Sequence, residues 1–245
     1  MRWLLGVPIV AVALVGAQAQ DRADELVKAA VAAAGGADAL AKFPAGRVAG
    51  KGTMTFAGAE TPFTFEQAYR VPGQFRTAVR GEVKGQTWEL VQVVSGETAK
   101  QTINGRSVPL TDAALRELQL AVLLNEVSQL APLAADRKFA FKPDKQFRGP
   151  DATWLLVQVR GYPELRLAFD RKAGHLVRVA FKATDPDTAK EADTEIGFAD
   201  FKEVSGLTRP TRSVVTRDGK KVTELTVEKF TPLEKIDPKA FTLDE

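Results

Sequence analysis

The sequence contains no cysteine and a single histidine, His175. Without cysteine there is no disulfide framework, no thiolate zinc site and no cysteine nucleophile. The acylated N-terminal cysteine of bacterial lipoproteins is excluded as well, so we expect no lipid anchor. One histidine leaves little scope for imidazole chemistry. Because His175 directly follows Gly174 in an expected turn, we expect it to lie on the surface.

Residue sets that carry catalysis or bind metals are also missing. Ser95 and Ser107 have no Gly-x-Ser-x-Gly context and no second histidine to share. Asp185 and Asp187 are separated by Pro186 and lack the glycine and glutamate positions of a calcium loop. We therefore expect a protein that is not an enzyme and has neither a metal site nor a cofactor.

Neither sign of charge dominates the chain, which has 34 Lys and Arg, 31 Asp and Glu, and a net charge of +3. Basic residues such as Arg76, Arg80 and Lys84 are spread along expected strands and form no dense patch. Nucleic-acid recognition needs a basic stripe or stacking aromatic residues, so we expect no nucleic-acid partner.

The N-terminus has the three parts of an export signal: the basic Arg2, an apolar run over Trp3–Val15 and the small-x-small sequence Ala17-Gln18-Ala19. The run is too short to span a bilayer, which disfavours the alternative of a membrane anchor. We predict a signal peptide over residues 1–19 and one domain over residues 20–245. The mature protein is expected in the periplasm, without a transmembrane segment.

Three segments have helical patterns: Asp21–Ala34, Ala37–Phe43 and Ala113–Leu130. The glycines after Ala34 end the first, and Thr111 or Asp112 can cap the third. The third is apolar around most of its circumference, because Ala121, Leu123 and Leu124 widen the face formed by its other leucines and valines. Such a helix is either buried on more than one side or in contact with an apolar ligand.

Most of the remaining chain alternates apolar and polar residues between short turns, the pattern of strands with one buried face. Asn104-Gly105 and Asp218-Gly219 are strong hairpin turns, and Gly50 and Gly52 indicate a bulge or a close backbone approach. The fold class is therefore mainly β, with about ten antiparallel strands and a few helices. A sheet of that size must curl, split or close.

Two outcomes remain open for so much apolar sheet surface. The sheet can fold on itself as a sandwich, or it can wrap the helices and leave an apolar cavity. Large apolar residues on the strands and the third helix then either fill the core or line the cavity. The candidate cavity residues are Phe65, Trp88, Leu90, Leu118, Val122, Leu123, Trp154 and Leu156.

Several motifs resemble the LolA-like superfamily of periplasmic lipoprotein carriers, including outer-membrane lipoprotein-sorting proteins. They are Tyr69–Arg76, with its basic residue, proline and aromatic residue, Val94–Thr98, Phe169–Val177, with its Asp-x-x-x-Gly hairpin, and the closing Asp237–Phe241. The resemblance implies an unclosed half β-barrel whose concave face is lidded by helices. It also implies a cavity that takes lipid or lipoprotein acyl chains.

The resemblance further implies that Arg70 holds the lid helices as a latch. Val71 separates Arg70 from Pro72, where the family pattern has the two adjacent, and one residue reverses the facing of a strand side chain. The alternative is an exposed strand arginine paired with a carboxylate.

Two functions therefore follow as expectations. The first is a periplasmic binding protein that carries lipid or lipoprotein acyl chains without chemistry. The second is a module with the same fold that binds another envelope protein, for example as a stress sensor, and transports no lipid.

Overall fold

The computed structural model of the chain describes residues 11–56, 58–130, 133, 139–144, 151–184 and 190–243. Its strands are β1 (Ala45–Phe56), β2 (Ala59–Arg70), β3 (Gln74–Val83), β4 (Gln86–Ser95), β5 (Thr98–Ile103), β6 (Arg106–Ser107), β7 (Ala140–Pro143), β8 (Ala152–Gln158), β9 (Leu165–Asp170), β10 (Leu176–Thr184), β11 (Glu191–Val204), β12 (Leu207–Arg217) and β13 (Lys220–Leu233).

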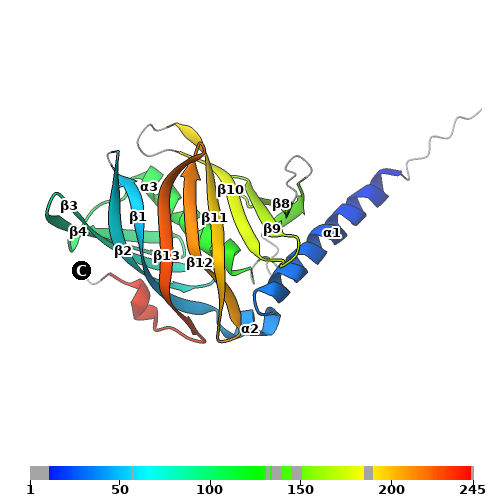
Figure 1. Ribbon diagram of the computed structural model, residues 1–245, viewed down its shortest axis with the longest axis horizontal. Helices are drawn as coiled ribbons and strands as arrows, with labels where there is room; N and C mark the ends of the chain where they lie inside the picture. The colour runs from blue at the N-terminus through cyan, green and yellow to red at the C-terminus, as the bar shows by residue number, and fades with distance from the viewer. Residues whose placement is uncertain are drawn as a thin grey trace, which may run out of the picture.

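All of these strands lie in one antiparallel sheet, in the order β6-β5-β4-β3-β2-β1-β13-β12-β11-β10-β9-β8-β7 (Figure 1). The first strand pairs with the last, and the described edges, β6 and β7, do not pair with each other. The predicted mainly β, unclosed antiparallel sheet is confirmed. The described sheet has 13 strands, more than the roughly ten expected.

Local turn chemistry accounts for the hairpins. Four two-residue turns have a positive φ at both positions: Lys84-Gly85, Asn104-Gly105, Ser205-Gly206 and Asp218-Gly219. These are the dihedrals that a type I′ turn requires, and they match the twist of the flanking strands. At Asn104-Gly105 the φ values are 51° and 75°, and the turn joins Ile103 directly to its partner Arg106.

The helices are α1 (Ala11–Ala33), α2 (Ala37–Lys42), α3 (Asp112–Gln129) and the short 3-10 helix η1 (Pro238–Phe241). The cap of α3 is as predicted: Thr111 Oγ1 accepts a hydrogen bond of 3.2 Å from the N–H of Ala114. The predicted start of the first helix, Asp21, was wrong. The alanine-rich segment before Asp21 contains no proline, and α1 begins at Ala11.

The predicted signal peptide falls partly outside the described residues, which begin at residue 11. Its remaining residues belong to α1, which projects from the body at its N-terminal end (Figure 1). Cleavage after Ala19 stays a prediction. None of the described helices combines the length and the apolar character needed to cross a membrane.

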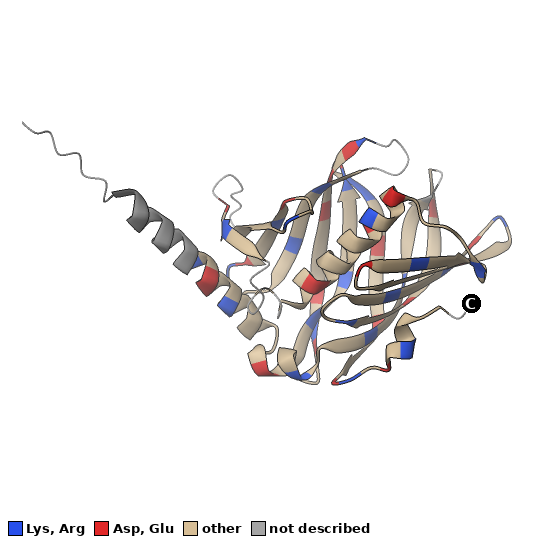
Figure 2. Cartoon of the chain, turned by 180° about the vertical axis from the view of Figure 1, so that it is seen from behind, with Lys and Arg blue, Asp and Glu red and all other residues tan. Residues whose placement is uncertain are grey.

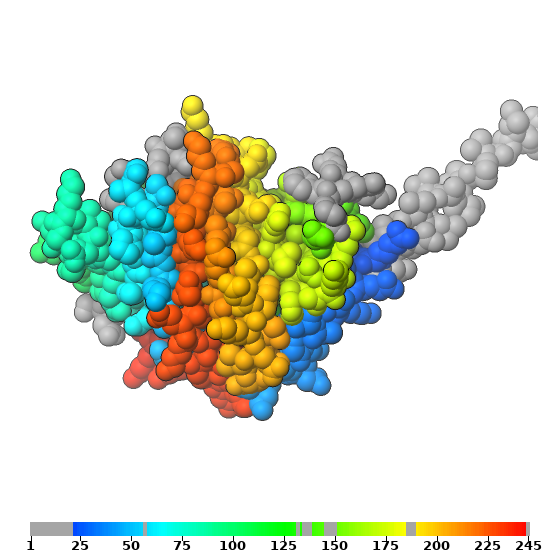
Figure 3. All heavy atoms as spheres, viewed as in Figure 1, coloured from blue at the N-terminus to red at the C-terminus, as the bar shows by residue number. Residues whose placement is uncertain are grey.

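Helices α1 and α3 lie on the concave side of the sheet, where Figure 2 shows α3 in front of the strands. The largest core cluster joins α1, through Val27 and Ala30, to α3, through Leu123 and Val127, and to β8, β9 and β10. The outer side, shown in Figure 3, is formed by strands lying side by side from β1 across β13 to β11. There η1 packs through Phe241 against the outward-facing side chains of β1, β2 and β4.

A row of glycines in β1 lets aromatic rings from β2 lie close to the sheet. Gly46 and Gly50 face Tyr69 and Phe65 across the ladder. A Cβ atom at Gly50 would lie 2.1 Å from the carbonyl oxygen of Thr226, and one at Gly46 would lie 2.7 Å from the hydroxyl of Tyr69. The ladder to β13 also shifts register between Ala49 and Gly50, so both predictions for this strand, a bulge and a close approach, are confirmed.

Candidate ligand-binding cavity

A cavity of about 350 Å³ opens between the concave face of the sheet and α3. Its floor consists of β1, β2 and β11 to β13, and α3 forms its roof. The apolar side chains that line it are Val48, Phe65, Phe75, Leu124, Leu176, Ile196, Phe198, Phe201, Val215, Leu225, Val227 and Phe230, among others. This is the size and character of a pocket for one small apolar ligand.

Helix α3 uses three of its sides at once. Leu118 and Val122 pack against Tyr69, Phe75 and Val94 of β2, β3 and β4. Leu123 and Val127 enter the core with α1. Ala121, Leu124, Asn125 and Ser128 face the cavity. The broad apolar circumference of this helix therefore reflects both of the alternatives predicted for it, because it is buried on two sides and lines a cavity on the third.

One end of the cavity is polar and is built around Arg209 of β12. Its Nη2 donates a hydrogen bond of 3.1 Å to Oε1 of Gln129, at the end of α3, and its Nη1 donates one of 3.2 Å to the carbonyl oxygen of Thr208. Burial lowers the pKa of Arg209, and the nearby Tyr69 partly opposes that fall.

Tyr69 lies beside Arg209, and its side chain is almost fully enclosed, with the residue only 2% exposed. Burial raises the pKa of the Tyr69 hydroxyl. Within the described part of the chain, neither this hydroxyl nor Nε of Arg209 has a hydrogen-bond partner of acceptable geometry. Two polar groups are thus left unsatisfied at one end of an apolar cavity, where an unmade hydrogen bond is costly.

The charges around the cavity are of one sign. Lys202, Arg209 and Arg212 line it, and no Asp or Glu does so among the residues that the structure describes. Arg212 is already engaged, since its Nε lies 2.9 Å from the carboxylate of Glu224. Arg209 makes no ion pair with any described residue.

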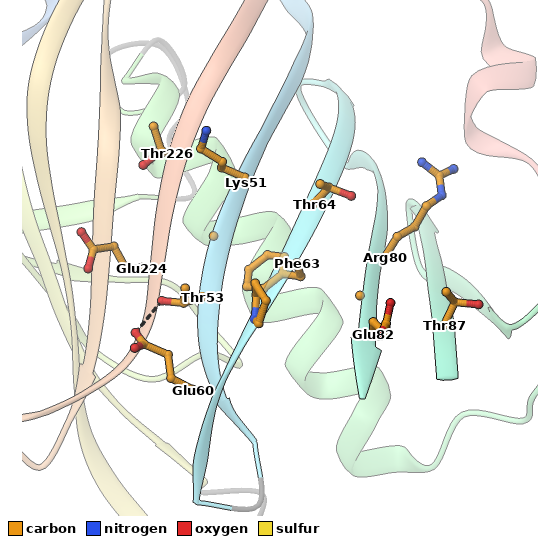
Figure 4. A pocket seen from close by; sticks show the side chains of 13 residues that line it. Lys51, Thr53, Glu60, Phe63, Thr64, Arg80, Glu82, Thr87, Glu224 and Thr226 are labelled. Carbon is orange, nitrogen blue, oxygen red and sulfur yellow. Dashed lines mark hydrogen bonds between the residues drawn. The ribbon is translucent and has the colours of Figure 1, made fainter. Parts of the chain in front are cut away.

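A second, larger hollow of about 720 Å³ lies mainly on the outer face of the sheet, over β1, β2, β3 and β13 (Figure 4). Most of its charged residues, namely Lys51, Glu60, Arg80 and Glu224, form ion pairs. Glu60 accepts hydrogen bonds from Thr53 at 2.8 Å and from Lys221 at 3.2 Å, and Nε of Arg80 lies 2.6 Å from Glu89. This hollow is open and ionic, so it lacks the enclosed apolar wall that the cavity under α3 has.

The predicted cavity residues are placed in different parts of the molecule. Phe65 lines the cavity. Leu118, Val122 and Leu123 lie on the two packed sides of α3. Trp88 and Leu90 point to the same side of β4 as Val94, and the ring of Trp88 lies over Gly81, 2.7 Å from where a Cβ atom would be.

Trp154 and Leu156 occupy the opposite face of β8 from Leu155 and Val157, which belong to the main core. They are buried, but they face away from α1 and α3. Seven of the eight predicted residues are therefore absent from the described lining of the cavity. Contact of any of the eight with a ligand stays a prediction.

Arg70 also lies away from the helix that it was expected to hold. Side chains alternate along β2, and Tyr69 faces α3, so Arg70 faces the outer side. No hydrogen bond or ion pair joins Arg70 to α3 within the described residues. Instead, a carboxylate of α3 makes the link: Glu126 accepts a hydrogen bond of 2.7 Å from the N–H of Gly73 in the β2–β3 turn. The latch role of Arg70 gains no support from this placement and stays untested.

His175 was predicted on the surface, and this was wrong in part. The residue is half-buried, lines the cavity and stacks on Phe201 with ring centroids 4.4 Å apart. Its position beside a turn suggested exposure, but the long β11 strand brings Phe201 against it. Among the described residues, no group of three or more His, Asp or Glu side chains could hold a metal ion.

Arg209 and Tyr69 were missed as site residues, although the sequence carried a signal for Arg209. In Leu207–Val215 the odd-numbered residues face the cavity or the core, and Arg209 interrupts that inward series with a charge. A charged residue at an inward position of a strand is uncommon unless it has a specific partner. Tyr69 carried no comparable signal, because tyrosine is ordinary at a half-buried position.

Comparison with solved structures decides the fold. A LolA superfamily protein from Nitrosomonas europaea is similar with a TM-score of 0.57 and 12% identity, over 90% of this chain and 97% of that one. This chain has a LolA-like fold. A DUF1329 family protein from Desulfovibrio piger is similar with a TM-score of 0.55 and 10% identity, over 89% of this chain and 96% of that one.

A domain from Vibrio parahaemolyticus described as an outer membrane lipoprotein-sorting protein is also similar to this LolA-like chain. The TM-score is 0.50 and the identity 13%, over 89% of this chain and 95% of that one. No family model and no curated protein matches the chain. The resemblance predicted from the sequence is confirmed at the level of the fold.

Proposed function

We propose that this protein is a non-enzymatic periplasmic binding protein that holds an apolar ligand, a lipid or a lipoprotein acyl chain, under α3. The cavity of about 350 Å³ between α3 and the sheet is the observation that carries the proposal. Its walls come from elements far apart in the chain, and they leave open an apolar surface that ordinary core packing would close.

The size of the cavity suits one hydrocarbon chain. A water molecule takes up about 30 Å³ in the liquid, and a methylene group is of similar size, so the volume corresponds to on the order of ten methylene groups. Each buried methylene contributes about 0.8 kcal/mol, before the cost of immobilising the ligand. One chain of that length is enough for measurable binding without any catalytic group.

The structural relatives support the same proposal. One of them is described as an outer membrane lipoprotein-sorting protein domain, a description that agrees with a lipid-modified ligand. For the present chain, the predicted export signal fits the proposed place of action, the periplasm.

The test is to fill the cavity from α3. Ala121 lines the cavity, whereas Ala113 lies exposed at the start of the same helix. Ala121→Trp should lower the affinity for a fluorescent medium-chain fatty acid at least tenfold, and Ala113→Trp should leave it unchanged. Native mass spectrometry of the same two variants and the original protein should show one bound chain except in Ala121→Trp.

Absence of binding by the original protein would contradict the proposal. In that case the second expectation from the sequence, an envelope protein-binding module with no lipid ligand, becomes the better account. Equal binding by Ala121→Trp and Ala113→Trp would place the ligand somewhere other than this cavity.

A further inference from the structure

We propose that the polar end of the cavity binds the anionic headgroup of a single-chain amphiphile, a carboxylate or a phosphate, with Arg209 and Tyr69 as the recognising residues. This inference rests on the proposed function, since it assigns a headgroup to the ligand whose chain the cavity holds. The chemistry shared by the two headgroups is an oxyanion that accepts several hydrogen bonds.

The first observation is the guanidinium of Arg209. It lies at an apolar cavity and has no carboxylate partner among the described residues. Its Nε has no hydrogen-bond partner of acceptable geometry there, although the Tyr69 hydroxyl is close enough to raise its pKa. A cation in such surroundings is normally paired, because desolvation without a counter-charge is unfavourable. A bound anion would supply the missing charge.

The second observation is the hydroxyl of Tyr69, which comes from a different strand, β2, and lies close enough to Arg209 for each group to affect the pKa of the other. This hydroxyl is buried and has no hydrogen-bond partner of acceptable geometry among the described residues, although the nearby Arg209 lowers its pKa against the effect of burial. It can donate to an oxyanion that also accepts from Nε of Arg209, so that one headgroup would satisfy both groups.

The third observation is how the guanidinium is held. Gln129 of α3 and the carbonyl oxygen of Thr208 accept hydrogen bonds from its two terminal nitrogens, and this fixes its plane. A guanidinium already oriented loses less conformational entropy when it binds an oxyanion. Since Gln129 ends α3, the headgroup contact would also lie next to the helix that covers the chain.

The outer hollow offers no comparable site, because Lys51 is paired with Glu228 at 2.7 Å and Lys221 with Glu60 and Glu224. The cavity volume, on the order of ten methylene groups, argues for one chain rather than several. An anionic amphiphile with one medium-length chain therefore fits both the apolar and the polar end.

The experiment compares three probes with the same chain: decanoate, decyl phosphate and decanol. Isothermal titration calorimetry at neutral pH would measure their dissociation constants with the original protein, Arg209→Gln, Tyr69→Phe and the control Arg178→Gln. Arg178 is an exposed arginine of β10 that forms an ion pair with Glu195 and does not line the cavity. The two anionic probes separate a carboxylate from a phosphate source.

We expect at least one anion to bind the original protein about tenfold more tightly than decanol, which is the usual effect of a charge-assisted hydrogen bond. Arg209→Gln should remove that preference while decanol still binds, Tyr69→Phe should reduce it, and Arg178→Gln should keep it. Retained decanol binding shows that a variant is folded.

Equal affinity of the original protein for all three probes would overturn the headgroup assignment and leave the proposed function standing. That comparison needs no variant, so it tests the headgroup assignment even if Arg209→Gln does not fold. An anion preference that survives in Arg209→Gln would also overturn the assignment. Failure of all three probes to bind would contradict the proposed function itself.

Discussion

The carboxylate of Glu126 on α3 accepts a hydrogen bond of 2.7 Å from the backbone N–H of Gly73, in the turn between β2 and β3. Glu126 is buried, at 4% exposure, so this bond joins the roof of the cavity to its wall away from solvent. The turn belongs to the segment that resembles the family's strand-turn-strand motif. In this chain the hydrogen bond described here between that segment and the covering helix therefore uses an acidic side chain of the helix.

Removing the Glu126 carboxylate should loosen α3. Glu126→Ala leaves the N–H of Gly73 without its partner and should lower the free energy of unfolding by about 2 kcal/mol. It should also speed dissociation of a bound chain, measured by stopped-flow displacement of a fluorescent fatty acid. Glu117→Ala, at an exposed position of the same helix, is the control. Identical unfolding and dissociation for the two variants would contradict the coupling of α3 to this turn.

Adding a methyl group at Gly50 should destabilise the sheet. The new Cβ atom would lie 2.1 Å from the carbonyl oxygen of Thr226 and 2.9 Å from the ring of Phe65, and both distances are shorter than real Cβ contacts. We expect Gly50→Ala to lower the free energy of unfolding by about 2 kcal/mol or more in urea denaturation.

Gly197→Ala is the matched control for that substitution. Gly197 is also within a strand, and a Cβ atom there would meet its nearest neighbour, the carbonyl oxygen of Val214, only at 3.9 Å. Its effect should stay within about 0.5 kcal/mol. Comparable losses at the two glycines would show that the close approach of β1 to its neighbours does not set the cost.

Asp170 should give the protein a pH-dependent contribution to stability. Its Oδ1 accepts hydrogen bonds from the N–H of Ala173 at 2.6 Å and of Lys172 at 2.9 Å, and these bonds lower the pKa of the carboxyl below its ordinary 3.8. A lowered folded-state pKa means that the stabilisation is present above 3.8 and is lost as the pH falls through the folded-state value.

Asp170→Ala should therefore be less stable than the original protein at neutral pH, and the difference should shrink in acid. Urea denaturation at a series of pH values measures it. Asp170→Asn keeps an oxygen acceptor but has no titrating group at this position. It should therefore retain part of the stability, and the difference in stability between Asp170→Asn and Asp170→Ala should not depend on pH. A gap that stays constant from neutral pH into acid would contradict the assignment to the charged form.

The N-terminal cap of α3 should be worth about 1 kcal/mol. Thr111→Ala removes the oxygen that accepts from the N–H of Ala114, whereas Thr111→Ser keeps it. Thermal unfolding should show a lower midpoint for the alanine variant and little change for serine. A serine variant as unstable as the alanine variant would point to the methyl group of Thr111 instead of the cap.

The parts of the fold that the sequence predicted are those decided by neighbours in the chain. Asn104-Gly105 and Asp218-Gly219 specify their turns by local dihedral preference, and Thr111 specifies the start of α3 by its own side chain. Such signals need no knowledge of the rest of the molecule. The number and antiparallel arrangement of the main strands follow from the same local rules.

The site depends instead on contacts between distant segments. Trp154 is a large apolar residue of the kind that lines cavities, but the alternation of side chains along β8 turns it away from α1 and α3. A shift of one residue along the strand would reverse that facing. Arg209 meets Gln129 and Tyr69 only after β12, α3 and β2 have come together. Amino-acid types alone left a cavity as one of two outcomes, and register and packing decide which residues line it.

A crystal structure of the protein with decanoate tests the central claim most directly. The account predicts electron density for one chain between α3 and the sheet, in contact with Phe65 and Leu124. Density for the chain in the outer hollow over β1 and β2, or a cavity closed by the protein's own side chains with no chain bound, would contradict it.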